Sequence, residues 1–175
     1  NAADENATTK KAFDQLFRRH GGLALGYAAR ILADKTKAED ITQDIWMKII
    51  DLAANYNPSS QFIPWMLTMI RRRCFNVLRD QGRKREDSGD ILDSVEDITR
   101  ESVEALLLRE QDKIAVQRAL SKLEGNQRAL LVAWMSEELS YEELAREFDL
   151  SLASVKSLLF RARKNLEKLL KEEAA

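Results

Sequence analysis

Hydrophobic residues recur three and four positions apart through most of the chain, and this spacing predicts an all-α protein. The first predicted helix starts near Thr8 or Thr9, and Gly21-Gly22 breaks or bends it. The further helices are expected at about Leu23 to Leu32, Thr36 to Ala54, Ile63 to Gln81, Val103 to Leu123 and Gln127 to Met135, followed by two more between Ser140 and Leu170.

The stretch from Ser140 to Leu170 has the pattern of a helix-turn-helix. Ser140 with Glu143 predicts a capping box, Asp149 and Leu150 predict the turn, and Ser151 predicts the cap of the second helix. The predicted inward stripe of that helix is Leu152, Val155, Leu159, Ala162, Leu166 and Leu169, and the predicted outward face is Ala153, Ser157, Phe160, Arg161, Lys164 and Lys168. Small, polar and basic outward residues suit a DNA major groove, although two helices of an ordinary bundle would show a similar pattern.

The helix from Thr36 to Ala54 carries two faces that are not simply polar. Thr36 with Glu39 predicts a capping box at its start. The inward stripe is Ala38, Ile41, Ile45, Ile49 and Leu52, and the opposite side is Asp40, Gln43, Met47 and Ile50. Such a helix either lies inside a bundle, which is the commoner case, or has a partner on its second face. The carboxylates of Glu39, Asp40 and Asp44 fit poorly inside a bundle, so a partner surface over part of this helix is a credible alternative.

The helix from Ile63 to Gln81 combines an aromatic ring with basic residues. Ile63, Leu67, Ile70, Cys74, Val77 and Leu78 are expected to face inward. A second ridge contains Trp65, Met69, Arg72, Asn76 and Arg79. An exposed ring beside guanidinium groups suits single-stranded or melted nucleic acid, because bases stack on the ring and phosphates pair with arginine. The alternative is that Trp65 belongs to the core.

The near-neutral net charge of −1 hides segments of opposite sign. The local charge is +6 from Ile70 to Arg85, −8 from Glu86 to Asp112, and +5 from Lys156 to Lys171. The stretch from Gly82 to Arg100 is rich in charge and lacks a sustained helical stripe, and it predicts a flexible linker between two small helical domains, although Ile91, Leu92 and Val95 could form a short docked turn. We expect domains at residues 1–83 and 102–175, joined by an acidic linker at residues 84–101.

Candidate catalytic and metal-ligating residues are few. His20 is the only histidine and Cys74 the only cysteine, so the sequence predicts neither an enzyme, nor a metal site, nor a cofactor. His20 is expected at the surface or at a helix end. The longest apolar run, about Ala129 to Met135, is too short to span a membrane, and the first residues lack the apolar core of a signal peptide. The sequence therefore predicts a cytoplasmic protein.

Four motifs, in order along nearly the whole chain, resemble those of bacterial sigma factors of the extracytoplasmic-function (ECF) group, group IV of the primary-type sigma family. Residues 38–46 (AEDITQDIW) are similar to the A-E-D-x-x-Q-[DE] signature of region two. Residues 62–84 resemble its F-x-x-W-L run, residues 140–145 resemble S-Y-E-E-I-A of region four, and residues 155–166 resemble V-K-S-R-x-x-R-A-R-x-x-L.

The resemblance implies two DNA-binding surfaces, one polymerase-binding surface and no catalytic residue. The clamp helices of the polymerase β′ subunit would bind Glu39, Asp40, Gln43, Asp44 and Met47. The melted minus-ten element would bind Asn55, Tyr56, Asn57, Phe62, Trp65, Met69, Arg72, Asn76 and Arg79. The minus-thirty-five element would bind Ser151, Ala153, Ser154, Lys156, Ser157, Phe160, Arg161 and Lys164.

The same resemblance implies core RNA polymerase (β′ clamp helices and β flap), promoter DNA and an anti-sigma factor as partners. Arg72, Asn76, Ala153 and Leu158 depart from the residues usual in the family, which affects the expected promoter sequence. A stand-alone helix-turn-helix regulator is the main alternative, and a helical adaptor without DNA contact is a second. The sigma hypothesis predicts weak DNA binding by the free chain, because the acidic linker competes for its two small basic segments.

Overall fold

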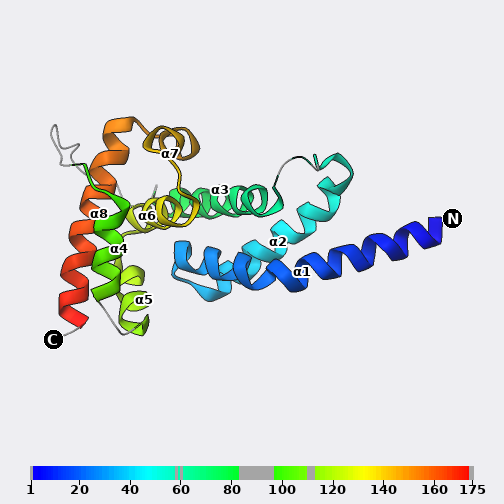
Figure 1. Cartoon of the computed structure of the whole chain (residues 1–175), viewed down its shortest axis with the longest axis horizontal. Helices are drawn as coiled ribbons and strands as arrows, with labels where there is room; N and C mark the ends of the chain where they lie inside the picture. The colour runs from blue at the N-terminus through cyan, green and yellow to red at the C-terminus, as the bar shows by residue number, and fades with distance from the viewer. Residues whose placement is uncertain (1, 58, 60, 83–96, 110–112, 174–175) are drawn as a thin grey trace.

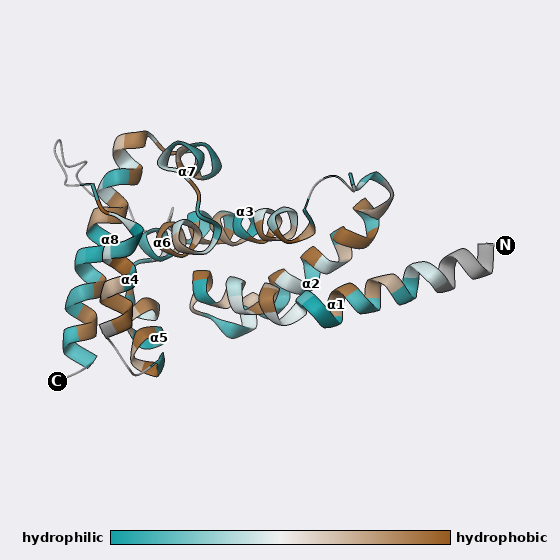
Figure 2. Ribbon diagram, in the orientation of Figure 1, coloured by the Kyte–Doolittle hydropathy of each residue, from teal (hydrophilic) through white to brown (hydrophobic). Residues whose placement is uncertain are grey.

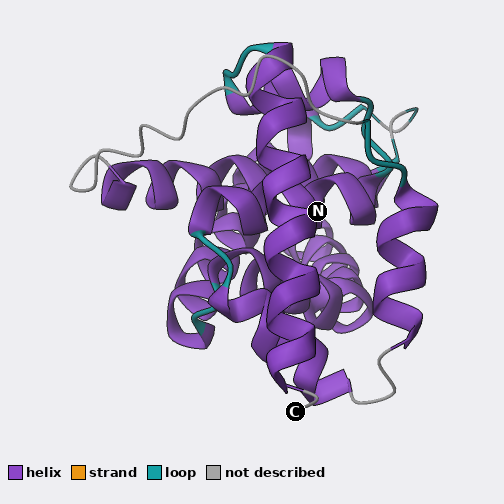
Figure 3. Ribbon diagram, turned by 90° about the vertical axis from the view of Figure 1, so that its left-hand side faces the viewer, coloured by secondary structure: helices purple, strands orange, loops and turns teal. Residues whose placement is uncertain are grey.

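The described part of the chain is helical apart from short connections (Figures 1 and 3). The structure is a computed structural model, and it describes residues 2–57, 59, 61–82, 97–109 and 113–173. Its elements are α1 (Ala2–Leu32), α2 (Lys35–Leu52), the short 3-10 helix η1 (Ala53–Asn55), α3 (Phe62–Gly82), α4 (Arg100–Arg109), α5 (Lys113–Lys122), α6 (Gly125–Glu137), α7 (Tyr141–Phe148) and α8 (Leu152–Glu173). The predicted all-α class is confirmed, whereas residues 84–96 of the predicted linker lie outside the described residues.

Two groups of helices meet at α6. Helices α1, α2 and α3 pack on one another, and α8 packs on α5, α6 and α7 (Figure 1). Helix α6 also contacts α1 and α3, so it touches both groups. Its residues from Gln127 to Trp134 are all buried, which is the pattern of a helix surrounded on every side. One continuous core therefore runs through both groups (Figure 2 shows the hydropathy along the helices).

Several predicted boundaries are wrong for local reasons. Gly21-Gly22 does not break α1, because packing against α2 and α3 outweighs the low helix propensity of glycine. The predicted helix from Val103 to Leu123 is two helices, α4 and α5, with residues 110–112 outside the description. Helix α6 begins at Gly125, two residues before the predicted start at Gln127. A Cβ at Gly125 would lie 3.1 Å from a Leu78 methyl group, so glycine permits the close approach of α6 to α3.

The start of α2 also differs from the prediction. The side chain of Asp34, not Thr36, caps the helix by accepting from the Lys37 backbone N–H at 3.0 Å. Ala33 precedes it with φ 52°, which separates α1 from α2 by a sharp reversal of the chain. Four of the five predicted inward residues of α2 are buried, while Leu52 is exposed.

Candidate functional site

The outward face of α2 is open to solvent, as its sequence pattern predicts. Glu39, Asp40, Gln43, Asp44 and Met47 are all exposed, and 60% of Met47 is accessible. The opposite stripe, which includes Ala38, Ile41, Ile45 and Ile49, is buried. An exposed methionine among carboxylates and an amide is a mixed surface that suits a protein partner with basic and apolar groups.

A shallow hollow lies beside this face, between α1 and α2. Trp46 is one of its lining residues and is 5% exposed. The rings of Phe13 and Phe17 stand edge-on to Trp46, with ring centroids 5.8 Å and 5.3 Å away. Phe17 is half exposed, so apolar surface continues from the hollow to the α2 face. The sequence pattern did not single out Trp46, because it falls between the two stripes of the helix.

The ridge on α3 is partly open and partly covered. Arg72, Asn76 and Arg79 are exposed, while Trp65 and Met69 are half-buried. Trp65 is therefore less exposed than the ridge pattern predicts. Its ring lies 5.0 Å from that of Tyr56 and 6.0 Å from that of Phe62. The three rings join the end of η1 to the start of α3, and this arrangement brings the predicted minus-ten residues Tyr56, Phe62 and Trp65 together.

The loop before α3 places the remaining predicted minus-ten residues at the surface. Asn55 and Asn57 are exposed. The side chain of Asn57 accepts from both the backbone N–H and the hydroxyl of Ser59, at 3.0 Å and 2.7 Å. His20 is half-buried in the middle of α1, with its ring 5.4 Å from that of Phe62. His20 therefore does not lie at a helix end, and its side chain is only partly exposed.

A polar contact that the sequence pattern did not predict joins α3 to the second group of helices. The side chain of Arg71 is 3% exposed, and it donates to Glu137 and, at 2.9 Å, to Glu147. Arg72 donates through Nε and Nη2 to the two oxygens of Glu147, both at 3.0 Å. Tyr27 of α1 donates its hydroxyl to Glu137. We call these five residues the polar seam.

Neighbouring groups shift the pKa values of several polar-seam residues. Hydrogen bonds from Arg72 and Arg71 hold the pKa of Glu147 at about 2, although partial burial opposes the shift. Burial favours the neutral form of Arg71, but its bonds to Glu137 and Glu147 outweigh this and raise its pKa. Burial and the Glu137 carboxylate raise the pKa of Tyr27. Arg71, Arg72 and Glu147 are therefore charged at neutral pH.

A second buried arginine joins the two groups at α6. Arg128 is 6% exposed and donates to the carbonyl oxygens of Ile31 and Leu32, at 2.7 Å and 3.1 Å. It also donates to the carbonyls of Leu123 and Ser121, at 2.6 Å and 3.3 Å. These carbonyls lie at the C-terminal ends of α1 and α5, where a helix presents unpaired acceptors and partial negative charge. One guanidinium thus caps two helices from different groups.

The predicted helix-turn-helix is present as α7 and α8. Ser140 and Glu143 form the capping box, with both reciprocal hydrogen bonds made. Asp149 adopts φ 53° at the turn, and the Ser151 hydroxyl accepts from the Ser154 N–H at 3.0 Å. Leu144 and Phe148 of α7 are buried. The predicted caps and turn are confirmed.

The outward face of α8 differs from the prediction in two residues. Ser151, Ala153 and Lys164 are exposed, and Ser154, Lys156, Phe160 and Arg161 are half-buried. Ser157 is fully buried, and its hydroxyl has no hydrogen-bond partner, so its predicted place on the outward face is wrong. Leu152, predicted to face inward, is 41% exposed. A packed helix pair can bury positions beside the stripe that periodicity alone assigns to solvent.

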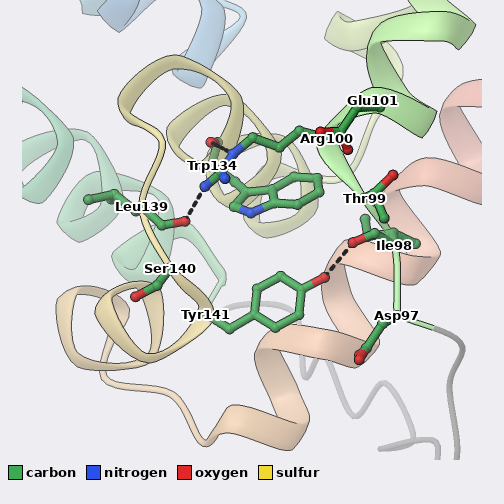
Figure 4. A pocket seen from close by; sticks show the side chains of 9 residues that line it. All are labelled: Asp97, Ile98, Thr99, Arg100, Glu101, Trp134, Leu139, Ser140 and Tyr141. Carbon is green, nitrogen blue, oxygen red and sulfur yellow. Dashed lines mark hydrogen bonds between the residues drawn. The ribbon is translucent and has the colours of Figure 1, made fainter.

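The segment before α4 is docked on the helix-turn-helix (Figure 4). Tyr141 donates its hydroxyl to the Ile98 carbonyl at 2.8 Å. Arg100 lies over the Trp134 ring at 5.1 Å and donates to the Trp134 carbonyl at 3.1 Å. Asp97 pairs with Lys156 of α8 at 3.0 Å. One basic side chain of the predicted minus-thirty-five surface is thus paired with a carboxylate of the same chain.

Among the described residues, no cluster of three or more His, Cys, Asp and Glu side chains could hold a metal ion. Cys74 is buried, and burial raises its thiol pKa to about 12, so the thiol is a poor nucleophile at neutral pH. No helix in the described ranges is long and apolar enough to cross a membrane.

Comparison with known proteins matches both halves of the chain to one family. Residues 16–84 match Sigma-70 region 2, and residues 113–166 match Sigma-70, region 4. The chain is 29% identical to the RNA polymerase sigma-H factor of Pseudomonas aeruginosa, over 92% of this chain and 87% of that protein. It is 28% identical to the RNA polymerase sigma factor CarQ of Myxococcus xanthus, over 92% of this chain and 90% of that protein.

A solved structure shows a similar fold. It is the co-crystal structure of the sigma factor RpoE with the anti-sigma factor NepR from Bartonella quintana. The two chains are 26% identical, with a TM-score of 0.59, and the alignment covers 92% of this chain and 98% of the other.

Proposed function

The chain belongs to the extracytoplasmic-function sigma factors, and from that premise we propose how its parts divide the work of promoter-specific transcription initiation. The observation that carries the proposal is that matches to region two and region four cover separate helix groups of one chain. This organisation favours a factor that brings core RNA polymerase to promoter DNA over a stand-alone helix-turn-helix regulator. In this role the protein is an initiation factor without catalysis of its own, and it works in the cytoplasm with the polymerase.

The face of α2 is the proposed contact with the β′ clamp helices. Its carboxylates Glu39, Asp40 and Asp44 lie on the same side as Gln43 and the exposed Met47. Acidic residues around an apolar centre fit a basic, amphipathic helical partner. The hollow over Trp46 extends the same surface with aromatic area.

The loop before α3 and the α3 ridge are the proposed minus-ten surface. Tyr56, Phe62 and Trp65 offer aromatic faces close to one another, and Arg72 and Arg79 offer charge further along the helix. A flipped base needs an aromatic pocket, and the strand backbone needs cations at a fixed spacing from it. Asn55, Asn57, Met69 and Asn76 complete the proposed surface.

Helix α8 is the proposed reader of the minus-thirty-five duplex. Ser151, Ala153 and Ser154 lie in and before its first turn, which is the end that enters the groove in helix-turn-helix proteins. Lys156, Phe160, Arg161 and Lys164 follow on the same side. Ser157 leaves this proposed set in the present conformation, because it is fully buried.

An apolar hollow among α4, α5, α6 and α8 is the proposed site of the β flap. Its lining includes Leu107, Leu108, Val116, Leu120 and Met135. Leu108 is 82% exposed, so an apolar side chain stands open at its edge. The complex of RpoE with NepR further supports an anti-sigma factor as a partner of this chain.

The experiment that tests the function is recovery with core RNA polymerase. Asp40→Lys with Asp44→Lys reverses two charges of the proposed clamp surface and is expected to abolish recovery while α-helical content is unchanged. Glu104→Lys with Glu172→Lys makes the same change in net charge at exposed positions far along the chain, and it is the matched control. Failure of the unaltered protein to bind core polymerase would overturn the proposal.

A stand-alone regulator makes the opposite prediction for DNA. It would bind duplex tightly without polymerase, usually on a palindromic site. In a gel shift with the purified chain we expect weak binding, and a clear gain only when core polymerase is added.

A further inference from the structure

The geometry points to an autoinhibitory contact in which Glu147 occupies the place of a DNA phosphate on Arg72. We propose that region four thereby holds region two closed until a DNA strand displaces that carboxylate. The inference deepens the proposed function and rests on Arg72 as a residue that contacts the minus-ten strand. Its evidence is the polar seam between α3 and the helices α6 and α7.

The contact has the form that an arginine makes with a phosphate. Arg72 donates Nε and Nη2 to the two oxygens of Glu147, each at 3.0 Å, in a forked pair. The same two donors bind two oxygens of a phosphate in nucleic-acid complexes. While Glu147 is in place, those donors are not available to a strand.

The two arginines of the seam differ in how readily they can exchange partners. The side chain of Arg71 is 3% exposed and lies between Glu137 and Glu147. That of Arg72 is 62% exposed, so a phosphate can approach it from solvent. Arg71 therefore anchors the seam, and Arg72 is the position where strand and carboxylate compete.

The seam is supported by apolar packing, which makes it a specific contact between the two regions. The rings of Phe75 on α3 and Phe148 on α7 meet edge to face with centroids 4.6 Å apart. Because Phe148 and Glu147 are neighbours on α7, the packing places the carboxylate over α3 in one register. Glu147 comes from the first helix of the helix-turn-helix, so closing region two also restrains region four.

The second predicted DNA surface shows the same arrangement. Asp97 pairs with Lys156 of α8 at 3.0 Å. Among the described residues, Arg79, Arg161 and Lys164 of the proposed DNA surfaces make no ion pair with a carboxylate. Each surface therefore has one basic residue paired with a carboxylate from another part of the chain. The other basic residues of each surface remain available for the first contact with DNA.

The test measures binding of a fluorescent 20-nucleotide oligo-dT by the full chain without polymerase. Glu147→Gln removes the charge and keeps the shape, and we expect about tenfold tighter binding than for Glu104→Gln. That control removes one charge from an exposed position of α4. The dependence of log Kd on log salt should steepen by about 0.7 for Glu147→Gln, because one further phosphate contact is made.

A second variant ties the gain to Arg72. Arg72→Ala added to Glu147→Gln should return the affinity to that of the unaltered protein. Equal affinities of Glu147→Gln and Glu104→Gln, or a gain that persists without Arg72, would each overturn the inference. Recovery with core polymerase is measured in parallel for the unaltered chain and for Glu147→Gln. That recovery depends on α2 and not on the contact between Glu147 and Arg72. Failure to recover the unaltered chain would therefore refute the proposed function separately from the autoinhibitory contact.

Discussion

Arg128 offers the sharpest test of how the two helix groups are held together. Arg128→Met keeps much of the side-chain length and removes the guanidinium. The buried carbonyls of Ile31, Leu32 and Leu123 and the part-buried carbonyl of Ser121 then lose their donor. A hydrogen bond from a charged group contributes roughly 1.5 to 3 kcal/mol. In the variant, water can hydrogen-bond to some of these carbonyls, so the total loss is smaller than the sum over four bonds. We therefore expect the free energy of unfolding to fall by roughly 3 to 5 kcal/mol.

The assay is urea unfolding at pH 7, followed by circular dichroism at 222 nm. Two of the four bonds reach across to α1, so the variant should also lose cooperativity, with one transition splitting into two as the regions uncouple. Arg118→Met is the matched control, because Arg118 is 66% exposed and lies 3.8 Å from Glu173. Its expected effect is below about 0.5 kcal/mol. A difference between the variants of less than about 0.5 kcal/mol would refute the role assigned to Arg128.

Two further predictions concern single groups. Ser157→Ala removes a buried hydroxyl without a partner, so it should raise the free energy of unfolding by about 1 kcal/mol in a urea titration. The control is Ser136→Ala, which changes an exposed serine and should alter the free energy of unfolding little. A loss of stability in Ser157→Ala would contradict the unpaired state of the hydroxyl. The pKa of Glu147 lies at about 2, below its usual 4.5, so its contribution of at most about 3 kcal/mol is present above pH 4.5 and is lost as the pH falls toward 2. Unfolding at pH 6, 4 and 3 should therefore show a steeper decline for the unaltered chain than for Glu147→Gln, and parallel declines would contradict it.

Local signals predicted the helix-turn-helix well, because its determinants lie within a few residues of one another. The capping box of Ser140 and Glu143 and the cap at Ser151 are interactions between neighbours in sequence. The open face of α2 was predictable for a similar reason, since Asp40, Gln43 and Met47 repeat at helical spacing. The break expected at Gly21-Gly22 is absent because packing against α2 and α3 keeps α1 continuous through two poor helix formers.

The roles of the buried charges were not predictable from local pattern. Arg71 and Arg72 are adjacent in sequence, yet one is buried between two carboxylates and the other is mostly exposed. Their partners Glu137 and Glu147 lie 66 or more positions away. Ser157 likewise sits at a position that spacing assigns to solvent, and only the packed helices show that it is buried.

The sequence by itself determined the all-α class, the caps and turn of α7 and α8, and the resemblance to ECF sigma factors. Those features depend on periodicity and on contacts between near neighbours. Only the tertiary structure decided how the two regions meet, through Arg128 at the ends of α1 and α5 and through the polar seam. The physical reason is that a buried guanidinium requires acceptors, and its acceptors come from segments that folding brings together from distant parts of the chain.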